Sequence, residues 1–257
     1  MSAVDALILA GSRGPNDPVA ALGGVAHKAL TPIAGRPMLA YVLDAVRAVP
    51  EVARIFICID AATDISAATG SIAFTRLDPA ASPAASVATA LATIGGERPL
   101  LITTADHPLL TPAMIRRFLD HAPPDADLVV ALAEAETVSA AFPEGSRTFY
   151  RLGGKGYGSC NLYLARKPEA ARVAEYWRGL ESHRKDPLRL AREIGLGFCL
   201  RYAAGMMTLE AAFAHVSRLT QACIRPVILP FAEAATDVDK PDDYRLVSRI
   251  LLQRARD

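Results

Sequence analysis

The sequence lacks the features that mark several classes of protein. It has four cysteines and no C-x-x-C pair, so neither a zinc site nor a redox motif is expected. No stretch approaches the roughly twenty apolar residues of a membrane helix, and the N-terminus enters an apolar run without a basic leader region. We therefore expect a soluble, cytoplasmic protein whose cysteines stay reduced. They are Cys58, Cys160, Cys199 and Cys223.

The chain also carries almost no excess charge, because its formal net charge is +1 at pH 7. A surface that binds nucleic acid or a polybasic patch that binds membranes is therefore not expected, whereas a small charged substrate is compatible. Internal repeats, low-complexity linkers and blocks of five like charges are absent from the sequence. Its 257 residues, 51% of them hydrophobic and 21% charged, predict a globular fold with a sizeable core.

Apolar runs alternate with helical periodicities along the first half of the chain. Strands are predicted at 4–10, 53–59, 72–75, 100–103 and 127–133, and helices at 37–49, 84–94 and from 112 onward. Strands that alternate with helices pair in parallel through right-handed crossovers, which predicts an α/β sandwich with a mostly parallel sheet and helices on both faces. The run at 100–103 is almost entirely apolar, so we place it at the centre of the sheet.

The pattern is looser from 134 to about 224. Strands are predicted at 147–152, 161–165 and 222–229, a turn at 153–158, and helices at 169–179, 187–194, 209–216 and 241–254. We expect a single domain over 1–257 in which about 134–224 form a central insertion. Arg147 and Arg151 flank the strand predicted at 147–152 and are expected to be solvated.

The polar, glycine-rich loop after the first strand is a candidate phosphate-binding site. Backbone N–H groups at and beside Gly11 can turn toward an anion, since glycine permits close approach. Lys28 adds a compact positive charge suited to phosphate. The loop has neither the G-x-x-x-x-G-K-[ST] pattern of a Walker loop nor the G-x-G-x-x-G pattern of a dinucleotide-binding turn. The alternative is an ordinary α/β loop with a solvated lysine.

Ten residues in this region follow the ordered signature L-x-A-G…K-x-L-x-x-(I/V)-x-G-(R/K)-P-(M/L)-(L/I). They are Leu9, Ala10, Gly11, Lys28, Leu30, Gly35, Arg36, Pro37, Met38 and Leu39. In this the chain resembles the MobA-like nucleotidyltransferases. The resemblance implies the nucleotide-diphospho-sugar transferase fold, a Rossmann-like (GT-A) sandwich. The family usually places an arginine in G-x-G-x-R, whereas Arg13 stands earlier here and a longer loop follows it, so its role as a triphosphate ligand is open.

A second segment, 104–110, supplies the first candidate metal ligand. Asp106 follows the end of the predicted central strand, where open α/β sheets place ligands. The segment resembles the family's metal-binding (T/G)-x-D-x-P-(L/F)-(L/I), which implies that Asp106 binds Mg²⁺, an ion that prefers carboxylate oxygens. The alternative, a helix cap, is better filled by Thr111. His107 is expected to be an ordinary polar residue of the surface.

The second metal ligand is expected near the end of the chain. The segment 237–244 resembles the family's (V/I)-(D/N)-x-P-(E/D)-D-L, and alignment on its proline places Asp239 at the ligand position, with Asp237 as the fallback. Asp242 and Asp243 fall in the first turn of the last predicted helix, where acidic side chains favour the helix dipole. We expect these two carboxylates to stabilise the helix.

Two further segments are candidates for binding the substrates. The segment 82–91 resembles the family's S-(V/L)-x-x-(G/A)-L, which lies against base and ribose, so Ser86 either contacts the nucleotide or starts a helix. The glycines at 153–158 are typical of a hairpin turn. In the MobA-like family, a glycine-asparagine segment at this place faces the acceptor, which implies acceptor-binding roles for Asn161 and Lys155.

Together these residues predict a Mg²⁺-dependent enzyme that transfers a nucleotidyl group from a nucleoside triphosphate to a phosphorylated acceptor, a sugar or alcohol phosphate, with release of pyrophosphate. Lys28 would hold the triphosphate, and Asp106 and Asp239 would hold the metal. The nucleotide would lie against residues of several segments, namely Leu9, Ala10, Gly11, Ser12, Arg13, Ser86, Thr104 and Ala105.

Two alternatives remain compatible with the sequence. Glycosyl transfer from a nucleotide sugar on the same fold would use a D-x-D metal motif, which Asp237 and Asp239 spell late in the chain. A nucleotide-binding regulatory protein without catalysis is the second alternative, which the early position of Arg13 favours. The sequence indicates neither the base, nor the acceptor, nor the oligomeric state.

Overall fold

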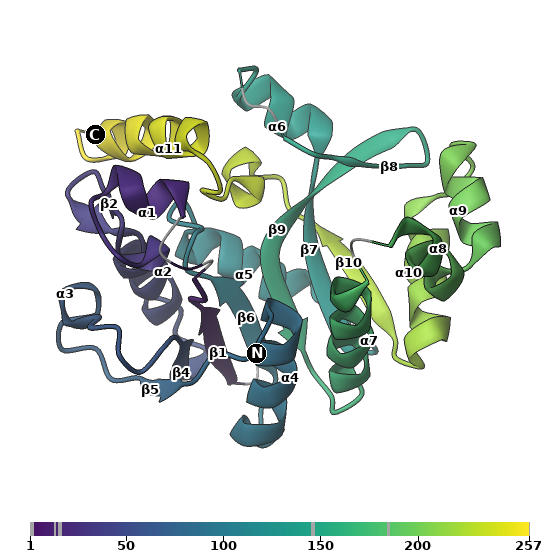
Figure 1. Cartoon of the computed structure of the whole chain (residues 1–257), viewed down its shortest axis with the longest axis horizontal. Coiled ribbons are helices and arrows are strands. Elements are labelled where there is room, and N and C mark those ends of the chain that lie inside the picture. The colour runs from purple at the N-terminus through teal and green to yellow at the C-terminus, as the bar shows by residue number, and fades with distance from the viewer. Residues whose placement is uncertain (1–2, 13, 15–16, 145–146, 184–185, 257) are drawn as a thin grey trace.

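The sheet at the centre of the fold takes strands from both halves of the chain (Figure 1). The computed structural model describes residues 3–12, 14, 17–144, 147–183 and 186–256. These residues form an eight-stranded sheet in which seven strands follow the order β10-β7-β9-β6-β1-β4-β5, and the eighth, β8, pairs with β9. The strands are β1 (Val4–Leu9), β4 (Val52–Cys58), β5 (Thr75–Leu77), β6 (Leu100–Thr104), β7 (Leu128–Glu134), β8 (Tyr150–Leu152), β9 (Lys155–Ala165) and β10 (Ile224–Ile228). A separate ribbon pairs β2 (Pro32–Ile33) with β3 (Arg36–Pro37).

Most of the pairings in the sheet are parallel. β1 pairs in parallel with β4 and β6, β4 with β5, and β7 with β10. β9 is the exception, because it runs antiparallel between β6 and β7 and joins the two parallel parts. The prediction of an α/β fold with a mostly parallel sheet is therefore confirmed, and the apolar strand at 100–103 lies in its middle as β6. The segment 134–224 contributes β9 to the sheet itself.

Helices cover both faces of this sheet (Figure 1). They are α1 (Pro18–Leu22), α2 (Met38–Arg47), α3 (Ser66–Thr69), α4 (Pro83–Ile94), α5 (Pro112–His121), α6 (Ala135–Ala141), α7 (Ala170–Ser182), α8 (Pro187–Ile194), α9 (Leu196–Ala203), α10 (Leu209–Thr220) and α11 (Pro241–Arg254), with the 3₁₀ helices η1 (Lys28–Leu30) and η2 (Ala232–Ala235). α4 and α7 lie in front of the sheet in the view of Figure 1, and α2 and α5 lie behind it. Among the described residues, no helix is both long and apolar enough to cross a membrane.

The strand β1 shows how the sheet separates two cores. Its side chains alternate, so Ala6 and Ile8 enter the cluster that α2 and α5 complete, whereas Leu7 enters the cluster on the α4 and α7 side. All three side chains are buried. Burial on both faces explains why this strand is apolar almost throughout.

The structure differs from the predicted elements around the glycines at 153–158. Only Gly153 and Gly154 form the turn, with φ of 60° and 77°, and β9 begins at the next residue. Gly156 lies within the strand, where an added Cβ would come within 2.7 Å of the Ala135 Cβ. This glycine therefore allows close packing of β9 against α6 and is not part of the turn.

Other elements differ in their boundaries or were not predicted. The short strand predicted at 72–75 is displaced to β5. α9 occupies a segment for which the sequence predicts no helix, and none of its residues is buried. Thr111 caps α5 as predicted, since its hydroxyl accepts from the Met114 N–H at 3.3 Å.

Leu101 and Leu252 provide a matched pair for testing the central position of β6. Leu101 is 0% exposed in β6, and Leu252 is 48% exposed on α11. We expect Leu101→Ala to lower the free energy of unfolding by about 3 kcal/mol, because it leaves a cavity between packed layers. Leu252→Ala should change it by no more than about 0.5 kcal/mol. Urea unfolding measures both, and equal losses would contradict the assignment of Leu101 to the core.

Candidate active site

The loops after β1 and β6 leave neighbouring strands at the same edge of the sheet. Leu9 pairs with Thr104 at the ends of these strands, and the Ala105 N–H donates to the Leu9 carbonyl at 2.8 Å. The chain continues from β1 to β4 on one side and later adds β6 on the other side. Open α/β sheets bind ligands at such a switch point, beyond the carboxyl ends of the strands.

Lys28 lies between two carboxylates at this edge. Its Nζ is 2.7 Å from Asp106 Oδ2 and 2.9 Å from Asp239 Oδ1, and its side chain is only 8% exposed. Asp106 and Asp239 are therefore close in space, since one nitrogen atom is hydrogen-bonded to both. Burial would lower the pKa of Lys28, but the two carboxylates outweigh this effect and raise the pKa above its ordinary value. The ammonium therefore stays charged at neutral pH.

Backbone hydrogen bonds fix the two carboxylates in this arrangement. The Val238 N–H donates to the Asp106 carbonyl at 2.9 Å, and the Val238 side chain is fully buried. The Asp243 carboxylate accepts from the N–H groups of Asp239 and Lys240, each at 3.1 Å. Asp243 thus caps α11, in the first turn where an acidic side chain was expected to stabilise the helix.

A third carboxylate, Asp237, lies beside this pair. Its Oδ2 accepts from Asn161 Nδ2 at 3.1 Å, and its Oδ1 is 3.5 Å from Arg147 Nη1. Burial, followed by the charges of Asp106 and Asp239, raises the pKa of Asp237 above its ordinary value. The three carboxylates therefore repel one another and depend on the cationic and amide groups around them.

Asn161 reaches Asp237 from an irregular part of β9. Its φ is 47°, in a region that few residues other than glycine adopt. The pairing of β7 with β9 also shifts register here, between Val130 and Leu132. Such bulges occur next to active sites, where they redirect a side chain. The structure thus brings Asn161, a predicted acceptor-binding residue, to the group of carboxylates.

Most of the Arg147 side chain is covered by protein, so the expectation that it is solvated is wrong. Its side chain is 9% exposed, Nη1 donates to the Ala235 carbonyl at 2.8 Å, and Nη2 is 3.7 Å from Asp243 Oδ1. The guanidinium ties the segment before β8 to the segment that carries Asp237. Arg151 is exposed, as expected. Local sequence does not distinguish the two arginines, because the partners of Arg147 lie 88 to 96 residues later.

His107 is also buried, so its predicted place on the surface is wrong. Its side chain is 1% exposed, and Nε2 is 3.2 Å from the Glu233 carbonyl in η2. Burial lowers the pKa of His107 below its ordinary value, so the ring is neutral at pH 7. The signal in the sequence is the apolar run that follows, since Leu109 and Leu110 are buried with it.

The loop after β1 presents backbone to open space. No heavy atom lies within 4 Å of a Cβ added to Gly11, and Gly11 and Ser12 are exposed. The Ser12 hydroxyl accepts from the Gly14 N–H at 3.1 Å, and the Asp17 carboxylate caps α1. Arg13, a predicted nucleotide-binding residue, lies outside the described residues.

His27 supports this region in a way that the sequence did not indicate. It is buried, and its Nδ1 accepts from the Ala29 N–H at 3.2 Å at the start of η1, the 3₁₀ turn that carries Lys28. Its neighbour Lys28 is thereby held in a fixed backbone conformation. Only its position beside Lys28 in the sequence could have drawn attention to it.

The structure gives Ser86 a local role. Its hydroxyl accepts from the Ala80 N–H at 2.9 Å, and its side chain is buried. Ser82, not Ser86, caps α4, because the Ser82 hydroxyl accepts from the Ala85 N–H. The alternative that Ser86 starts a helix is therefore wrong, and its contact with a nucleotide stays a prediction.

Lys155 lies at the start of β9, six residues before Asn161. Its Nζ is 2.7 Å from Glu134 Oε1, and its side chain is 60% exposed. In the part of the chain that the structure describes, no ion pair or hydrogen bond joins Lys155 to Lys28, Asp106 or Asp239. Of the two predicted acceptor-binding residues, the structure thus joins Asn161 to the carboxylates, whereas Lys155 pairs elsewhere.

The carboxylates around Lys28 suit a divalent cation that also binds the substrate. Among the described residues, no group of three or more His, Cys, Asp or Glu side chains could hold a metal ion by itself. Mg²⁺ needs fewer protein ligands, because one or two carboxylates, substrate phosphates and water complete its coordination. Asp106 Oδ1 is buried without a hydrogen-bond partner in the described chain, an oxygen that such a cation would satisfy.

Arg147 and Arg151 allow the buried ion pairs to be tested by substitution. We expect Arg147→Ala to lower the free energy of unfolding by about 3 kcal/mol, because Asp237 and Asp243 would be left without their cationic partner. Arg151→Ala should change it by no more than about 0.5 kcal/mol, since this side chain is exposed. Chemical denaturation of both variants measures the difference, and a stable Arg147→Ala variant would argue against this role.

The chain is similar to known proteins along most of its length. The model of the MobA-like NTP transferase domain matches residues 6–193. A hypothetical transferase from Thermus thermophilus shares 30% identity with a TM-score of 0.80, over 94% of this chain and 99% of that one. A search of curated protein sequences found no match.

Two more distant structures share the fold. A 4-diphosphocytidyl-2C-methyl-D-erythritol synthase from Anaerococcus prevotii is 11% identical with a TM-score of 0.61, over 98% of this chain and 96% of that one. A CMP:2-keto-3-deoxy-manno-octonic acid synthetase complexed with CTP is 15% identical with a TM-score of 0.58, over 99% and 100%. The family match covers β1, η1 and β6, the elements that bring Lys28 and Asp106 together. The chain therefore belongs to the MobA-like NTP transferase family and is a nucleotidyltransferase.

Proposed function

We propose that this enzyme transfers a nucleotidyl group from a nucleoside triphosphate to a phosphorylated small-molecule acceptor, a sugar or alcohol phosphate, in a Mg²⁺-dependent reaction. An oxygen of the acceptor phosphate attacks the α-phosphorus of the triphosphate. The bond from the α-phosphorus to the bridging oxygen breaks, and pyrophosphate leaves with that bonding pair. The attacking oxygen is already anionic, so no side chain has to act as a nucleophile or remove a proton.

The observation that carries this proposal is the single ammonium group of Lys28 held between Asp106 and Asp239. Nucleotidyl transfer requires that the charge on the phosphates be neutralised while the attacking oxygen is held in line. A buried lysine and two carboxylates at the carboxyl ends of β1 and β6 provide a positive charge and two cation ligands at one point. This combination suits a triphosphate that is bound together with a metal ion.

On the nucleotide side, the loop after β1 would bind the phosphates through its backbone. The exposed Gly11 leaves room for an anion to approach the N–H groups of the loop, and Lys28 follows after α1 in the same connection. The residues that would line the nucleotide are the last residues of β1 and β6 and those that follow them, namely Leu9, Ala10, Ser12, Thr104 and Ala105. Thr104 Oγ1 is buried and has no hydrogen-bond partner among the described residues.

Asp106 and Asp239 would hold Mg²⁺, with Asp237 beside them. When bound, the ion would neutralise charge on the triphosphate and polarise the α-phosphorus. In the structure these carboxylates share the ammonium of Lys28, so the site already requires positive charge. Lys28 would then hold the phosphates while the carboxylates hold the ion.

On the acceptor side, Asn161 would position the acceptor phosphate. Its amide bonds Asp237, which the guanidinium of Arg147 also contacts. This chain of contacts links β9 to the metal-binding segment, so an acceptor bound at Asn161 would lie next to the carboxylates. Lys155 would meet a more distant part of the acceptor, if it leaves Glu134. The middle of the chain, about 134–224, is in this view the acceptor-side part of a single domain.

We further propose that the enzyme acts in the cytoplasm. All four cysteines are unpaired, and Cys58 and Cys160 are buried within the fold. A reducing compartment keeps such thiols unmodified.

Pyrophosphate release tests the proposed reaction and its carboxylates. Each of the four nucleoside triphosphates is offered with Mg²⁺ and a mixed pool of sugar and alcohol phosphates. We expect one or more to give pyrophosphate, and Asp106→Asn and Asp239→Asn to slow the release about 100-fold or more, because charge stabilisation at the phosphates is lost. Chelation of the metal should stop the wild-type reaction.

Asp242→Asn is the matched control for these variants. Asp242 lies three residues after Asp239, but it is 78% exposed and pairs with Arg245 at 2.6 Å. Its substitution removes the same charge and should leave the rate unchanged. Failure of every triphosphate to give pyrophosphate above the Asp106→Asn background would overturn the proposal. Release of a nucleoside diphosphate from a nucleotide sugar would instead support glycosyl transfer.

The role of Asn161 predicts a change in one Michaelis constant only. Asn161→Ala should raise the KM for the acceptor about tenfold, by loss of a hydrogen bond to a charged group, and should leave the KM for the triphosphate nearly unchanged. Steady-state kinetics with each substrate varied in turn measures both constants. An equal rise of the two constants would show that the substitution disturbs the whole site.

A further inference from the structure

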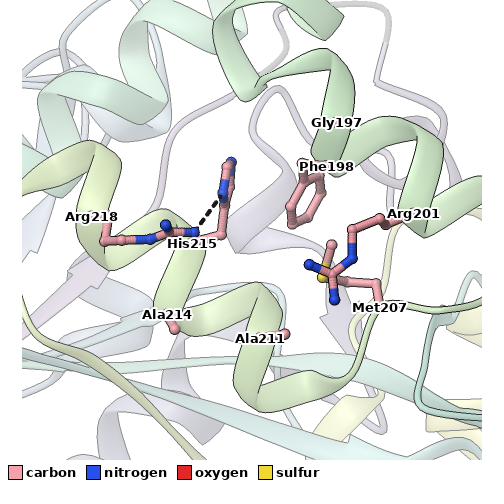
Figure 2. A pocket seen from close by; sticks show the side chains of 8 residues that line it. All are labelled: Gly197, Phe198, Arg201, Met207, Ala211, Ala214, His215 and Arg218. Carbon is pink, nitrogen blue, oxygen red and sulfur yellow. Dashed lines mark hydrogen bonds between the residues drawn. The ribbon is translucent and has the colours of Figure 1, made fainter.

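A pocket lies between α9 and α10, apart from the candidate active site (Figure 2). It has a volume of about 470 Å³, within the range of pockets that bind small molecules. Phe198 and Arg201 of α9 line one side, His215 and Arg218 of α10 the other, and Met207 the end near the connecting loop. Figure 2 shows both arginine side chains directed inward from opposite sides.

The pocket has strong positive charge and no carboxylate. None of the residues that line it is acidic. Within the described chain, neither Arg201 nor Arg218 forms an ion pair, whereas Arg189 on the neighbouring α8 pairs with Glu193 at 3.6 Å. Two guanidinium groups that face one pocket without a compensating carboxylate attract an anion.

Arg218 is held in place by a chain of contacts. His215 Nε2 lies 2.6 Å from the Ile194 carbonyl, which can only accept, so Nε2 carries the proton. Nδ1 is then the acceptor for Arg218 Nη2 at 3.4 Å, the contact drawn in Figure 2. Phe198 stacks on the His215 ring, with centroids 4.6 Å apart. The pocket thus positions one guanidinium through two other lining residues.

We propose that this pocket binds the phosphate group of a small phosphorylated molecule. A guanidinium can bind a phosphate through two parallel hydrogen bonds. The two guanidinium groups together carry the two positive charges that balance a phosphate dianion. The volume exceeds the need of one phosphate group, and the apolar side chains of Phe198 and Met207 leave a surface for a short carbon skeleton. The ligand is therefore a phosphate ester of a small alcohol or sugar, with free phosphate as the simpler source of the same group.

This pocket is separate from the site around Lys28. The two share no residue, and α10 packs against β10 at one end of the sheet, whereas η1, which carries Lys28, packs against α2 (Figure 1 shows α10, β10 and α2). A backbone bond connects the pocket to the acceptor side, because the Gly153 N–H donates to the Met207 carbonyl at 2.8 Å. Gly153 belongs to the turn that leads into β9 and to Asn161. A ligand in the pocket would therefore contact the loop that supports this turn.

Arginine side-chain NMR of the whole protein tests this site directly. The Nε–Hε signals of Arg201 and Arg218 are assigned from the single variants Arg201→Ser and Arg218→Ser, and the protein is titrated with glycerol 3-phosphate, inorganic phosphate and malonate. We expect both signals to shift together and to saturate with a phosphate ligand. The double variant Arg201→Ser/Arg218→Ser should bind the phosphate ligand at least about tenfold more weakly than the wild type. Malonate, a dicarboxylate, should bind more weakly than phosphate.

The double variant Arg189→Ser/Arg192→Ser is the matched control, because it removes the same charge from α8 outside the pocket. It should bind as the wild type does, and the backbone spectrum of each variant verifies its fold. Tighter binding of the ester supports a phosphate-ester site, and equal binding of inorganic phosphate supports a site for the free ion. Three results would overturn the proposal: unchanged signals of Arg201 and Arg218, non-saturating shifts of many surface arginines, or equal binding of malonate.

Discussion

The buried ammonium of Lys28 between Asp106 and Asp239 is the interaction on which the active-site edge of this enzyme depends. Without a positive charge, the carboxylates of Asp106, Asp237 and Asp239 would face one another at a partly buried place, and each would oppose ionisation of the others. The lysine lowers this repulsion and joins three segments that are far apart in the chain. The same charge that holds these loops together is suited to the phosphates of a substrate. In the proposed reaction, one group would therefore serve both the stability of these loops and the binding of the substrate.

The sheet explains why these segments can meet. β1 and β6 end side by side, so the loops that follow them emerge at one edge. The segment from Asp237 to Asp239 is held against the loop after β6 by a backbone hydrogen bond to the Asp106 carbonyl. Arg147 holds the chain just before this segment, because it donates to the Ala235 carbonyl. Asn161 lies in the antiparallel strand β9, where the pairing with β7 shifts register. Each candidate side chain thus stands on a loop, a 3₁₀ turn or an irregular strand position, supported by regular elements with buried cores on both faces.

The sequence predicted the parts of this arrangement that leave a local signal. The strands predicted at 4–10 and 100–103 follow from apolar runs and agree with β1 and β6 to within one residue. Lys28, Asp106 and Asp239 follow from motifs of the MobA-like family. Arg147 and His107 were misjudged, because burial depends on partners 88 to 126 residues away. Gly156 was assigned to a turn because a glycine required by close packing looks the same in sequence as one required by positive φ. Contacts with other segments, not residue type, distinguish these cases.

The two cationic places in the molecule differ in how their charge is balanced. At the strand ends, the ammonium of Lys28 is compensated by carboxylates, so an anion alone gains little there and a substrate is better bound together with a metal cation. Between α9 and α10, Arg201 and Arg218 face a pocket without a carboxylate, so an anion is attracted without a cation. A net charge of +1 conceals this difference, because it sums over both places. Chelation of divalent metal should therefore weaken phosphate binding at the first place and leave it unchanged at the second.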